Sequence, residues 1–390
     1  MHRLLPLLLA ACAVDASKDA DDTDPGTDTD GPDVDPADAD GDGTVTAAEW
    51  VAFFEVPGPH DVGFRLTEFT YADPTTDAPR TLRLSLWFPT DATGAQYATF
   101  TGPLAPDDVL LDPVAADGTF PLAVFSHGHQ GDMDNCAHVM TRMASHGWVV
   151  AAPEHTGNTL KDGGGRTTEI YVQRPFDVSA TLDHLLQADP LAPQLDGRVY
   201  ATGHSFGGYT TFLVAGAGWD VDHWDPICQG SSSDPFCSTW SPKLTALMRQ
   251  GASDDRVLAA ATLSGGNWGQ LREAGLATVD RPLLQLSGAL DGSVTNDGSS
   301  DPIWRDLPAG DKVRADLAHG DHQSYTDFAG AGAGIIPGTS RDALEGQRSL
   351  RLVEVYLLAF GAKHVLAREG LDPVLDGTLV VDEDVTLSTK

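Results

Sequence analysis

The sequence predicts an α/β fold in which a mostly parallel sheet carries helices on both faces. From about residue 120 onward, short apolar runs typical of buried strands alternate with segments that have helical spacing. Before them, residues 64–71 and 81–88 alternate apolar and polar side chains with a period of two, which predicts half-buried antiparallel strands. Residues 58–390 are sufficient for one large domain with a substantial core.

The segment 203–208, Gly-His-Ser-Phe-Gly-Gly, is the most informative part of the chain. It lies between residues 198–202, which have the pattern of a buried strand, and residues 209–215, which have that of a helix. A G-x-S-x-G motif between a strand and a helix is typical of a nucleophile elbow, a tight turn that exposes the serine hydroxyl above the sheet. The flanking glycines suit a turn that has no room for side chains. Ser205 is therefore the candidate nucleophile.

The candidate base comes late in the chain. A serine hydroxyl is a poor nucleophile until a base takes its proton, so a histidine is needed near Ser205. The strand pattern of residues 311–317 leads into a loop that contains His319 and His322. Both histidines follow the end of a strand, and either one could reach the serine.

The candidate acid lies one strand earlier. A carboxylate must hold the histidine in the right tautomer and stabilise its charged form. The apolar run 281–288 ends in a glycine just before Asp291, and Asp297 and Asp301 are competing candidates. With Asp291, the order along the chain is serine, aspartate, histidine, which is the order of the α/β-hydrolase fold.

Two backbone amides are expected to bind the negative charge that develops on a substrate carbonyl oxygen. One belongs to Phe206, the residue after the nucleophile. The other should follow an early strand, and residues 121–128 have the pattern of a strand that ends in Ser-His-Gly. The amide of His129 is the expected second donor.

Four segments resemble the platelet-activating-factor acetylhydrolase and dienelactone-hydrolase-like branch of the α/β-hydrolases. They are Phe-Ser-His-Gly at 125–128, Ala-Ser-His-Gly-Trp-Val-Val-Ala-Ala-Pro-Glu-His at 144–155, Gly-His-Ser-Phe-Gly-Gly at 203–208 and His-Gln-Ser-Tyr-Thr-Asp-Phe at 322–328. The resemblance covers residues 58–370. It implies an α/β-hydrolase fold and hydrolysis of a small-molecule or lipid-like carboxylic ester through an acyl-enzyme intermediate, with no cofactor for catalysis.

The resemblance also bears on the base and the acid. It selects His322 over His319, because the family's base stands in a His-Gln-x-aromatic-x-Asp-Phe segment. The acetylhydrolases keep their acid in a Leu-Asp-Ala segment after the strand that follows the nucleophile helix, where this chain has Thr-Leu-Ser-Gly-Gly at 262–266. Ser264 cannot act as the acid. Many dienelactone-type relatives keep theirs one strand later, which is the place of Asp291.

Other functions stay open on this sequence. A polyester or cutinase-like hydrolase and a phospholipid-deacylating hydrolase would use the same three residues, because ester specificity depends on the shape of the pocket. A different class is a catalytically silent, calcium-dependent surface binding protein on the same fold. Such a protein would have no need of an intact set of Ser205, Asp291 and His322.

An insertion follows the nucleophile helix at residues 217–250. Its position predicts a lid or a wall of the substrate site. It contains Cys228 and Cys237, which predicts a local disulfide in an oxidising compartment.

The N-terminus indicates export to a bacterial cell envelope. Residues 1–11 form a signal peptide with a basic start and a short apolar run, and Leu-Ala-Ala-Cys at its end resembles a lipobox, in which Cys12 is lipidated. The apolar run is too short to span a bilayer, so membrane contact is expected only through the lipid on Cys12. We expect an outer-membrane lipoprotein facing the periplasm or the outside, and plain secretion is the alternative. Residues 12–37 are expected to be a disordered acidic linker, because they offer almost no large apolar side chains to bury.

Residues 38–49 place oxygen ligands in the register of an EF-hand calcium loop. The expected ligands are Asp38, Asp40, Asp42, the backbone carbonyl of Thr44, Thr46 and Glu49. Residues 38–55 would combine this loop with an exiting helix, whereas prolines before the loop exclude an entering helix. Such a half-site is expected to bind Ca²⁺ weakly, at about 10⁻⁴–10⁻³ M, and to stabilise or connect rather than catalyse.

The overall charge excludes one class of partner. The chain has 57 acidic and 24 basic residues and a net charge of −33. Nucleic-acid binding depends on a basic surface, and the sequence contains no basic cluster. A nucleic acid is therefore not an expected partner.

Overall fold

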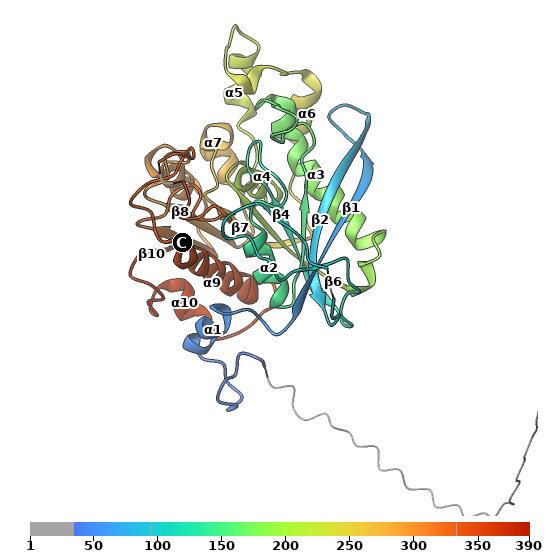
Figure 1. The fold of residues 1–390 in the computed structure, drawn as a ribbon. Helices are drawn as coiled ribbons and strands as arrows, with labels where there is room; N and C mark the ends of the chain where they lie inside the picture. The colour runs from blue at the N-terminus through green and yellow to red at the C-terminus, as the bar shows by residue number, and fades with distance from the viewer. Residues whose placement is uncertain (1–34, 95, 333) are drawn as a thin grey trace, which may run out of the picture.

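Ten strands form one sheet that runs through the protein (Figure 1). The computed structural model describes residues 35–94, 96–332 and 334–390. The order of the strands is β10-β9-β8-β7-β6-β4-β5-β2-β1-β3. The predicted signal peptide, Cys12 and most of the predicted linker lie outside the described residues.

The elements alternate along the chain as the sequence predicts. The strands are β1 (Asp61–Ala72), β2 (Pro79–Thr90), β3 (Leu110–Leu111), β4 (Phe120–Ser126), β5 (Val149–Pro153), β6 (Leu195–His204), β7 (Val257–Leu263), β8 (Leu283–Gly288), β9 (Lys312–Leu317) and β10 (Val385–Thr389). The helices are α1 (Ala47–Phe54), α2 (Ala137–Ser145), α3 (Thr168–Gln187), α4 (Phe206–Val214), α5 (Val221–Cys228), α6 (Pro242–Gln250), α7 (Trp268–Leu276), α8 (Asp301–Asp306), α9 (Gly346–His364) and α10 (Asp372–Asp376).

The central strands of the sheet are parallel and its edges are antiparallel. The strands from β4 to β9 pair in parallel. At one edge β1 and β2 pair antiparallel, as their period-two patterns predict, and β2 joins the parallel part by an antiparallel pairing with β5. At the other edge β10 pairs antiparallel with β9. Strand β10 was not predicted from the sequence.

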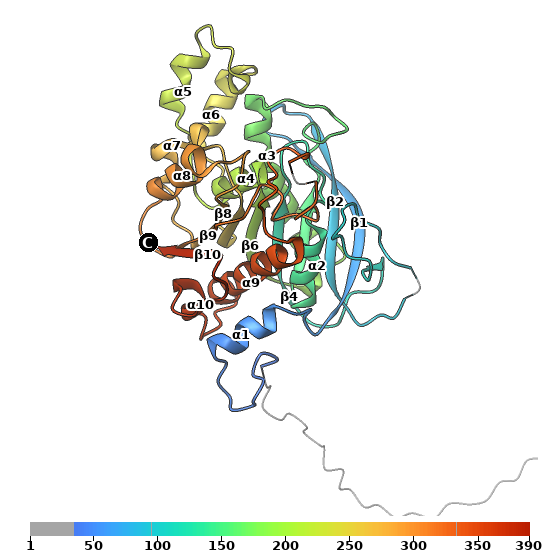
Figure 2. The same cartoon turned by 60° about the vertical axis from the view of Figure 1, so that its left-hand side comes forward.

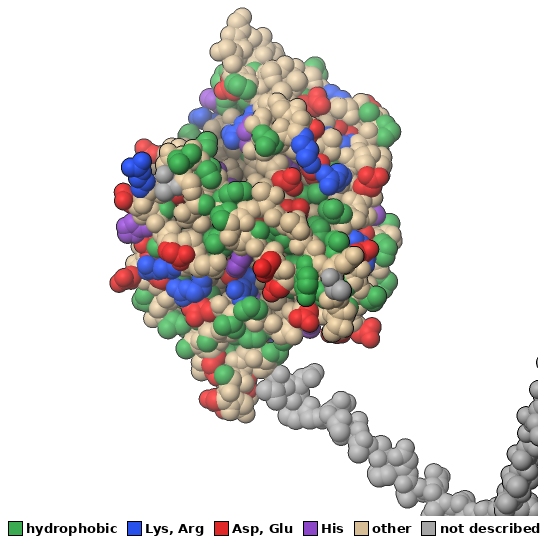
Figure 3. All heavy atoms as spheres, in the orientation of Figure 1, with side chains coloured by type: hydrophobic (Ala, Val, Ile, Leu, Met, Phe, Trp, Pro, Cys, Tyr) green, Lys and Arg blue, Asp and Glu red, His purple; other side chains and the backbone are tan. Residues whose placement is uncertain are grey.

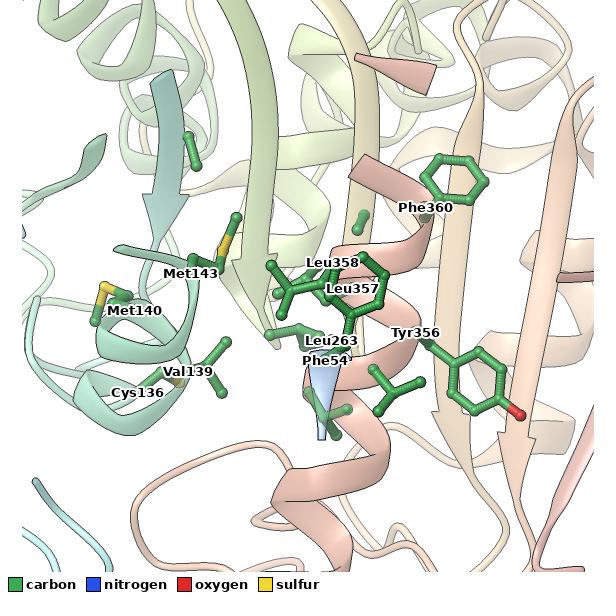
Figure 4. Packing of buried hydrophobic residues seen from close by; sticks show 14 of the residues in the cluster. Phe54, Cys136, Val139, Met140, Met143, Leu263, Tyr356, Leu357, Leu358 and Phe360 are labelled. Atoms are coloured by element: carbon green, nitrogen blue, oxygen red, sulfur yellow. The ribbon is translucent and has the colours of Figure 1, made fainter. Parts of the chain in front are cut away.

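Two separate hydrophobic cores cover the two faces of the sheet. On β7, Ala259, Ala261 and Leu263 join the core beneath α2 and α9, whereas Ala260 joins the core beneath α3 and α4. This alternation arises because successive side chains of a strand point to opposite faces of the sheet. Since both faces of the central strands are buried, their sequences are almost continuously apolar. Figure 4 shows α2 and α9 contributing side chains to the first core, and Figure 2 shows α3 and α4 on the opposite side of the sheet from α9.

Helix α1 packs on the body of the protein against α9 and α10. Trp50 and Phe54 are buried in the same core as α9, and Trp50 Nε1 donates a hydrogen bond of 2.8 Å to the carbonyl oxygen of Glu369. The helix after the acidic loop is thus part of the packed domain. Within the described ranges, no helix combines the length and the apolar character that crossing a bilayer requires.

Candidate active site

Ser205 occupies the turn between β6 and α4. Its φ of 56° and ψ of −115° lie in a region that residues other than glycine rarely adopt, which marks a strained turn. A Cβ atom on Gly207 would lie 1.7 Å from the carbonyl oxygen of Ser126, so no side chain fits there. The local geometry is the one that the G-x-S-x-G pattern predicts.

His322 connects Ser205 to Asp291. Its Nε2 lies 3.0 Å from Ser205 Oγ, and its Nδ1 lies 2.8 Å from Asp291 Oδ2. These side chains come from the loops after β6, β8 and β9, which end at the same edge of the sheet because the strands are parallel. All three residues are buried. The structure therefore brings together the three residues that the sequence analysis selected.

The carboxylate of Asp291 is fully engaged. Its Oδ1 accepts hydrogen bonds of 2.7 Å from the backbone amides of Ser293 and Val294. Burial alone would raise the pKa of Asp291, but the hydrogen bonds from His322, Ser264 and the backbone outweigh burial and hold this pKa below its usual value. An ionised Asp291 is the form that can accept the Nδ1 proton of His322 and stabilise an imidazolium.

Ser264 contacts both partners at the position where the acetylhydrolases keep their acid. Its hydroxyl donates a short hydrogen bond to Asp291 Oδ2 and lies 3.0 Å from His322 Nδ1. Ser264 follows β7, one strand before the acid, and its φ is 50°. Ser264 is not the acid but holds the acid in place, a role that no sequence motif indicates.

The competing candidates lie elsewhere. His319 Nδ1 contacts Asp384 Oδ1 at 2.5 Å, so this histidine faces the β10 side of its loop. Asp297 and Asp301 are exposed, and Asp301 Oδ1 accepts a hydrogen bond of 2.6 Å from Arg314. Neither aspartate contacts His322 through a hydrogen bond in the described part of the chain.

The expected oxyanion donors flank the nucleophile. Phe206 begins α4, and His129 lies in the loop after β4, which borders the same cavity as Ser205. Among the residues that the structure describes, neither backbone amide donates a hydrogen bond to a protein acceptor. Both amides are thus available to a ligand, as an oxyanion hole requires.

Arg174 supports the oxyanion loop from beneath. It lies on α3, is fully buried, and donates hydrogen bonds to Ser126 Oγ at 3.0 Å and to the carbonyl oxygen of His127. It also donates to Asn158 Oδ1 at 2.7 Å, and the Asn158 amide lies 3.0 Å from Nδ1 of the His129 ring. Burial lowers the pKa of Arg174 to about 9. The loop that carries the His129 amide is therefore fixed by a buried cation that lies far from it in the sequence.

A second buried set of side chains braces Ser126. Its Oγ lies 2.8 Å from His155 Nε2, and His155 Nδ1 lies 2.8 Å from Asp177. Burial would raise the pKa of Asp177, but the charge of Arg80 and the hydrogen bonds from His155 and Arg80 lower it to about 2. These residues give no sequence motif, and only the fold brings them together.

Ser205 and His322 line a cavity of about 390 Å³. The cavity is bordered by the oxyanion loop and by the loops after β7, β8 and β9. Its other lining side chains include two histidines, one arginine, a few apolar residues and several amides and hydroxyls: His129, Gln130, Asn135, Arg166, His204, Asn267, Ser293, Val294, Ser299, Gln323, Ile336 and Pro337. The site can therefore hold a small polar molecule against the nucleophile.

The predicted insertion forms α5 and α6, which protrude beyond the end of the sheet in Figures 1 and 2. Cys228 and Cys237 are joined by a disulfide. The carbonyl oxygen of Phe236 accepts a hydrogen bond from Thr168 at the start of α3. No residue of 217–250 borders the Ser205 cavity in the described ranges, so action as a lid would need a movement of the insertion.

The acidic loop is only partly arranged as a cation site. Asp38, Asp40 and Asp42 each place a carboxylate oxygen within 4.8 Å of the others. Glu49, by contrast, caps α1, because its Oε2 accepts hydrogen bonds from the backbone amide of Thr46 at 2.9 Å and from the Thr46 hydroxyl at 2.7 Å. A capping box has the same S/T-x-x-E spacing as positions 9 and 12 of the loop.

Comparisons with known proteins agree with this architecture. A family model described as Chlorophyllase matches residues 95–221, which include Ser205 and end before the acid and the base. The structure is similar to that of a ferulic acid esterase from Streptomyces cinnamoneus, with a TM-score of 0.59, 21% identity, and coverage of 84% of this chain and 96% of that chain. No curated protein sequence matches the chain. At this identity the structural likeness concerns the fold, and the predicted α/β-hydrolase fold is confirmed. The family match supports the prediction of a carboxylic ester hydrolase.

Proposed function

We propose that the protein is a serine hydrolase that cleaves carboxylic esters through an acyl-enzyme intermediate. The observation that carries this proposal is the continuous contact from Ser205 Oγ through His322 to Asp291, built on a strained turn. A serine, a histidine and an aspartate in this order of contact form the arrangement that turns a hydroxyl into a nucleophile.

The reaction follows from the positions of these atoms. Ser205 Oγ attacks the ester carbonyl carbon while His322 Nε2 takes the hydroxyl proton, and Asp291 stabilises the resulting imidazolium. The carbonyl oxygen becomes negative and accepts hydrogen bonds from the amides of Phe206 and His129. His322 then gives its proton to the departing alkoxide oxygen. A water molecule releases the acid by the same steps, with His322 taking the proton of the water and returning it to Ser205.

The substrate class is a small ester. Long acyl chains need an extended apolar wall, and the cavity beside Ser205 is lined mainly by amides and hydroxyls. This composition favours a polar or short-chain ester over a phospholipid or a long-chain polyester. Activity on p-nitrophenyl esters from acetate to palmitate tests the point, with Ser205→Ala as the control. We expect the highest kcat/KM at short chains, and a maximum at palmitate would contradict the small-ester proposal.

A silent binding protein is the contrasting possibility. It would show no turnover of any ester and no reaction with a fluorophosphonate, although the protein is folded. Ester turnover and fluorophosphonate labelling are each measured with and without Ca²⁺, because an enzyme that needs the metal to fold would be inactive in its absence. Turnover that disappears in Ser205→Ala would decide in favour of the hydrolase.

We also propose that the acidic loop binds Ca²⁺ weakly. The three clustered aspartates support this proposal. For full EF-hand ligation, Glu49 would exchange its hydrogen bonds with Thr46 for the metal. Calorimetric titration with Ca²⁺ tests it, using Asp40→Asn as the variant and Asp61→Asn, an exposed aspartate outside the loop, as the matched control. Equal heats for the three proteins would contradict calcium binding at this loop.

For the N-terminus we propose a lipid anchor on Cys12 and a place in the bacterial cell envelope. The lipobox-like sequence before Cys12 supports this proposal. Metabolic labelling with a palmitate analogue is expected to mark the wild type and not Cys12→Ala. Labelling of neither protein, with the wild type found in the medium, would favour plain secretion.

A further inference from the structure

Arg166 places a cation in the cavity beside the nucleophile. It precedes α3, is half-buried, and borders the same cavity as Ser205. Its guanidinium carbon lies 5.2 Å from the centre of the Phe206 ring, and its Nη1 donates a long hydrogen bond of 3.4 Å to Asn267 Oδ1. The guanidinium of Arg166 therefore lies against Phe206 of α4 on one side and contacts Asn267 in the loop before α7 on the other.

The charge of Arg166 has no counter-ion in the part of the chain that the structure describes. Most other arginines described, such as Arg256 and Arg314, form ion pairs with aspartates or glutamates. Arg166 forms none, and no aspartate, glutamate or lysine is among the described residues that border the cavity. The chain has 57 acidic residues, yet none of the described residues that line this cavity has a carboxylate that could neutralise Arg166. Figure 3 shows acidic and basic side chains interspersed over one face of the molecule.

Most of the hydrogen-bonding capacity of Arg166 is unused. A guanidinium has five N–H donors, and among the described residues one hydrogen bond from Arg166 is found, to Asn267. Asn267 is itself fixed, because Tyr171 Oη donates a hydrogen bond of 3.0 Å to the same oxygen. The planar fork of a guanidinium matches a carboxylate or a phosphate with two parallel hydrogen bonds. A partly buried cation attracts an anion more strongly than an exposed one, because less water screens it.

We propose that Arg166 binds an anionic group, a carboxylate or a phosphate, that the ester substrate carries apart from its scissile carbonyl. This inference rests on the proposed ester hydrolysis and narrows its substrate class to anionic esters. Arg166 thus sets specificity. Arg174, the other arginine near Phe206, cannot take this role, because it is fully buried and its donors are taken by Thr210, Asn158, Ser126 and His127.

Matched pairs of esters test the proposal. Mono-p-nitrophenyl glutarate and its methyl ester differ in a charge on the acyl side, and 4-acetoxybenzoate and its methyl ester differ in a charge on the leaving group. Release of the phenol is followed in each case, and each enzymatic rate is divided by the spontaneous rate of the same ester to correct for its intrinsic reactivity. We expect the wild type to prefer the anionic member of at least one pair by about tenfold or more in kcat/KM, mainly through KM. Arg166→Gln is expected to remove this preference, because kcat/KM falls more for the anionic member of the pair than for the neutral one.

Controls separate substrate binding from other roles of the arginine. Arg249→Gln removes the same charge from α6, which does not border the cavity, and should leave the preference unchanged. Arg166→Lys keeps the charge and is expected to retain part of the preference. Inhibition by glutarate or by inorganic phosphate identifies the anion, and either inhibition supports the proposal if it disappears in Arg166→Gln.

Two results would overturn the inference. An active wild type that shows no preference in either pair, or an equal loss on charged and neutral esters in Arg166→Gln, would show that Arg166 does not recognise an anion on the substrate. A folded wild type that hydrolyses no ester and leaves Ser205 unlabelled would overturn the proposed function itself, and with it the inference.

Discussion

Replacing Asp291 with asparagine is expected to remove most of the activity and to preserve the fold. The Oδ1 atom of Asp291 accepts hydrogen bonds from the amides of Ser293 and Val294, and Oδ2 faces His322 Nδ1. Asparagine can keep its oxygen toward the two backbone amides, which turns its NH₂ group toward His322. Because an NH₂ group donates, His322 must carry its own proton on Nε2. That tautomer cannot accept the proton of Ser205.

The size of the effect follows from the loss of the base. The same substitution in a Ser-His-Asp protease lowers kcat by about 10⁴, and we expect a loss of about 10³–10⁴ here. At about 1.36 kcal/mol per factor of ten, this loss corresponds to about 4–5.5 kcal/mol of transition-state stabilisation. The Ser264 hydroxyl can also turn its proton toward His322 Nδ1, 3.0 Å away, which would reinforce the unproductive tautomer.

The assay is kcat for p-nitrophenyl acetate, with circular dichroism and the melting temperature as checks of the fold. Asp297→Asn and Asp301→Asn serve as matched controls, because both aspartates are exposed and close in sequence. We expect both controls to stay within about threefold of the wild type. The reasoning is refuted if Asp291→Asn keeps more than a tenth of the activity, or if either control shows the large loss instead.

Three further predictions follow from the same contacts. Ser264→Ala should lower kcat about tenfold, because a hydrogen bond to a carboxylate is lost, and a rate equal to the wild type would assign Ser264 a packing role only. Arg174→Gln should lower both kcat and the melting temperature, since the buried acceptors of the oxyanion loop lose their donor, and unchanged values of both would contradict the support that we assign to it. Burial lowers the pKa of His155 and of His204 to about 3, against 6.5 for an unburied histidine. These two histidines therefore bind more protons in the unfolded chain than in the folded one below about pH 6.5, and their contribution should lower the melting temperature as the pH decreases from 6.5 toward 3. A melting temperature that is constant between pH 7 and 4.5 would contradict this effect.

The nucleophile elbow could be predicted because its determinants are local. A strand, a glycine-flanked serine and a helix are consecutive in the sequence, and the tight turn allows few other residues. The parallel strands at the centre of the sheet could also be predicted, because strands that are buried on both faces have almost continuously apolar sequences. Strand β10 lacks this signal, because most of its residues lie exposed or half-buried at the edge of the sheet.

The surroundings of the site depend on contacts between distant segments. Asp291 was one of three nearby aspartates, and only the fold shows which of them reaches His322. Ser264, Arg166 and Arg174 carry no motif, and each acquires its place from the packing of α3, α4 and α7 around the strand ends. The register of the acidic loop was visible in the sequence, but the same Thr-x-x-Glu spacing also caps a helix, and the capping geometry is the one that the structure adopts.

Labelling with a fluorophosphonate tests the central claim most directly, because the reagent reacts preferentially with a serine that a neighbouring base has activated. We predict that the wild type is labelled at Ser205, as located by peptide mapping, and that Ser205→Ala is not labelled. Labelling of Ser205→Ala at another residue, or a folded wild type that resists the reagent with and without Ca²⁺, would contradict the assignment of Ser205 as the nucleophile.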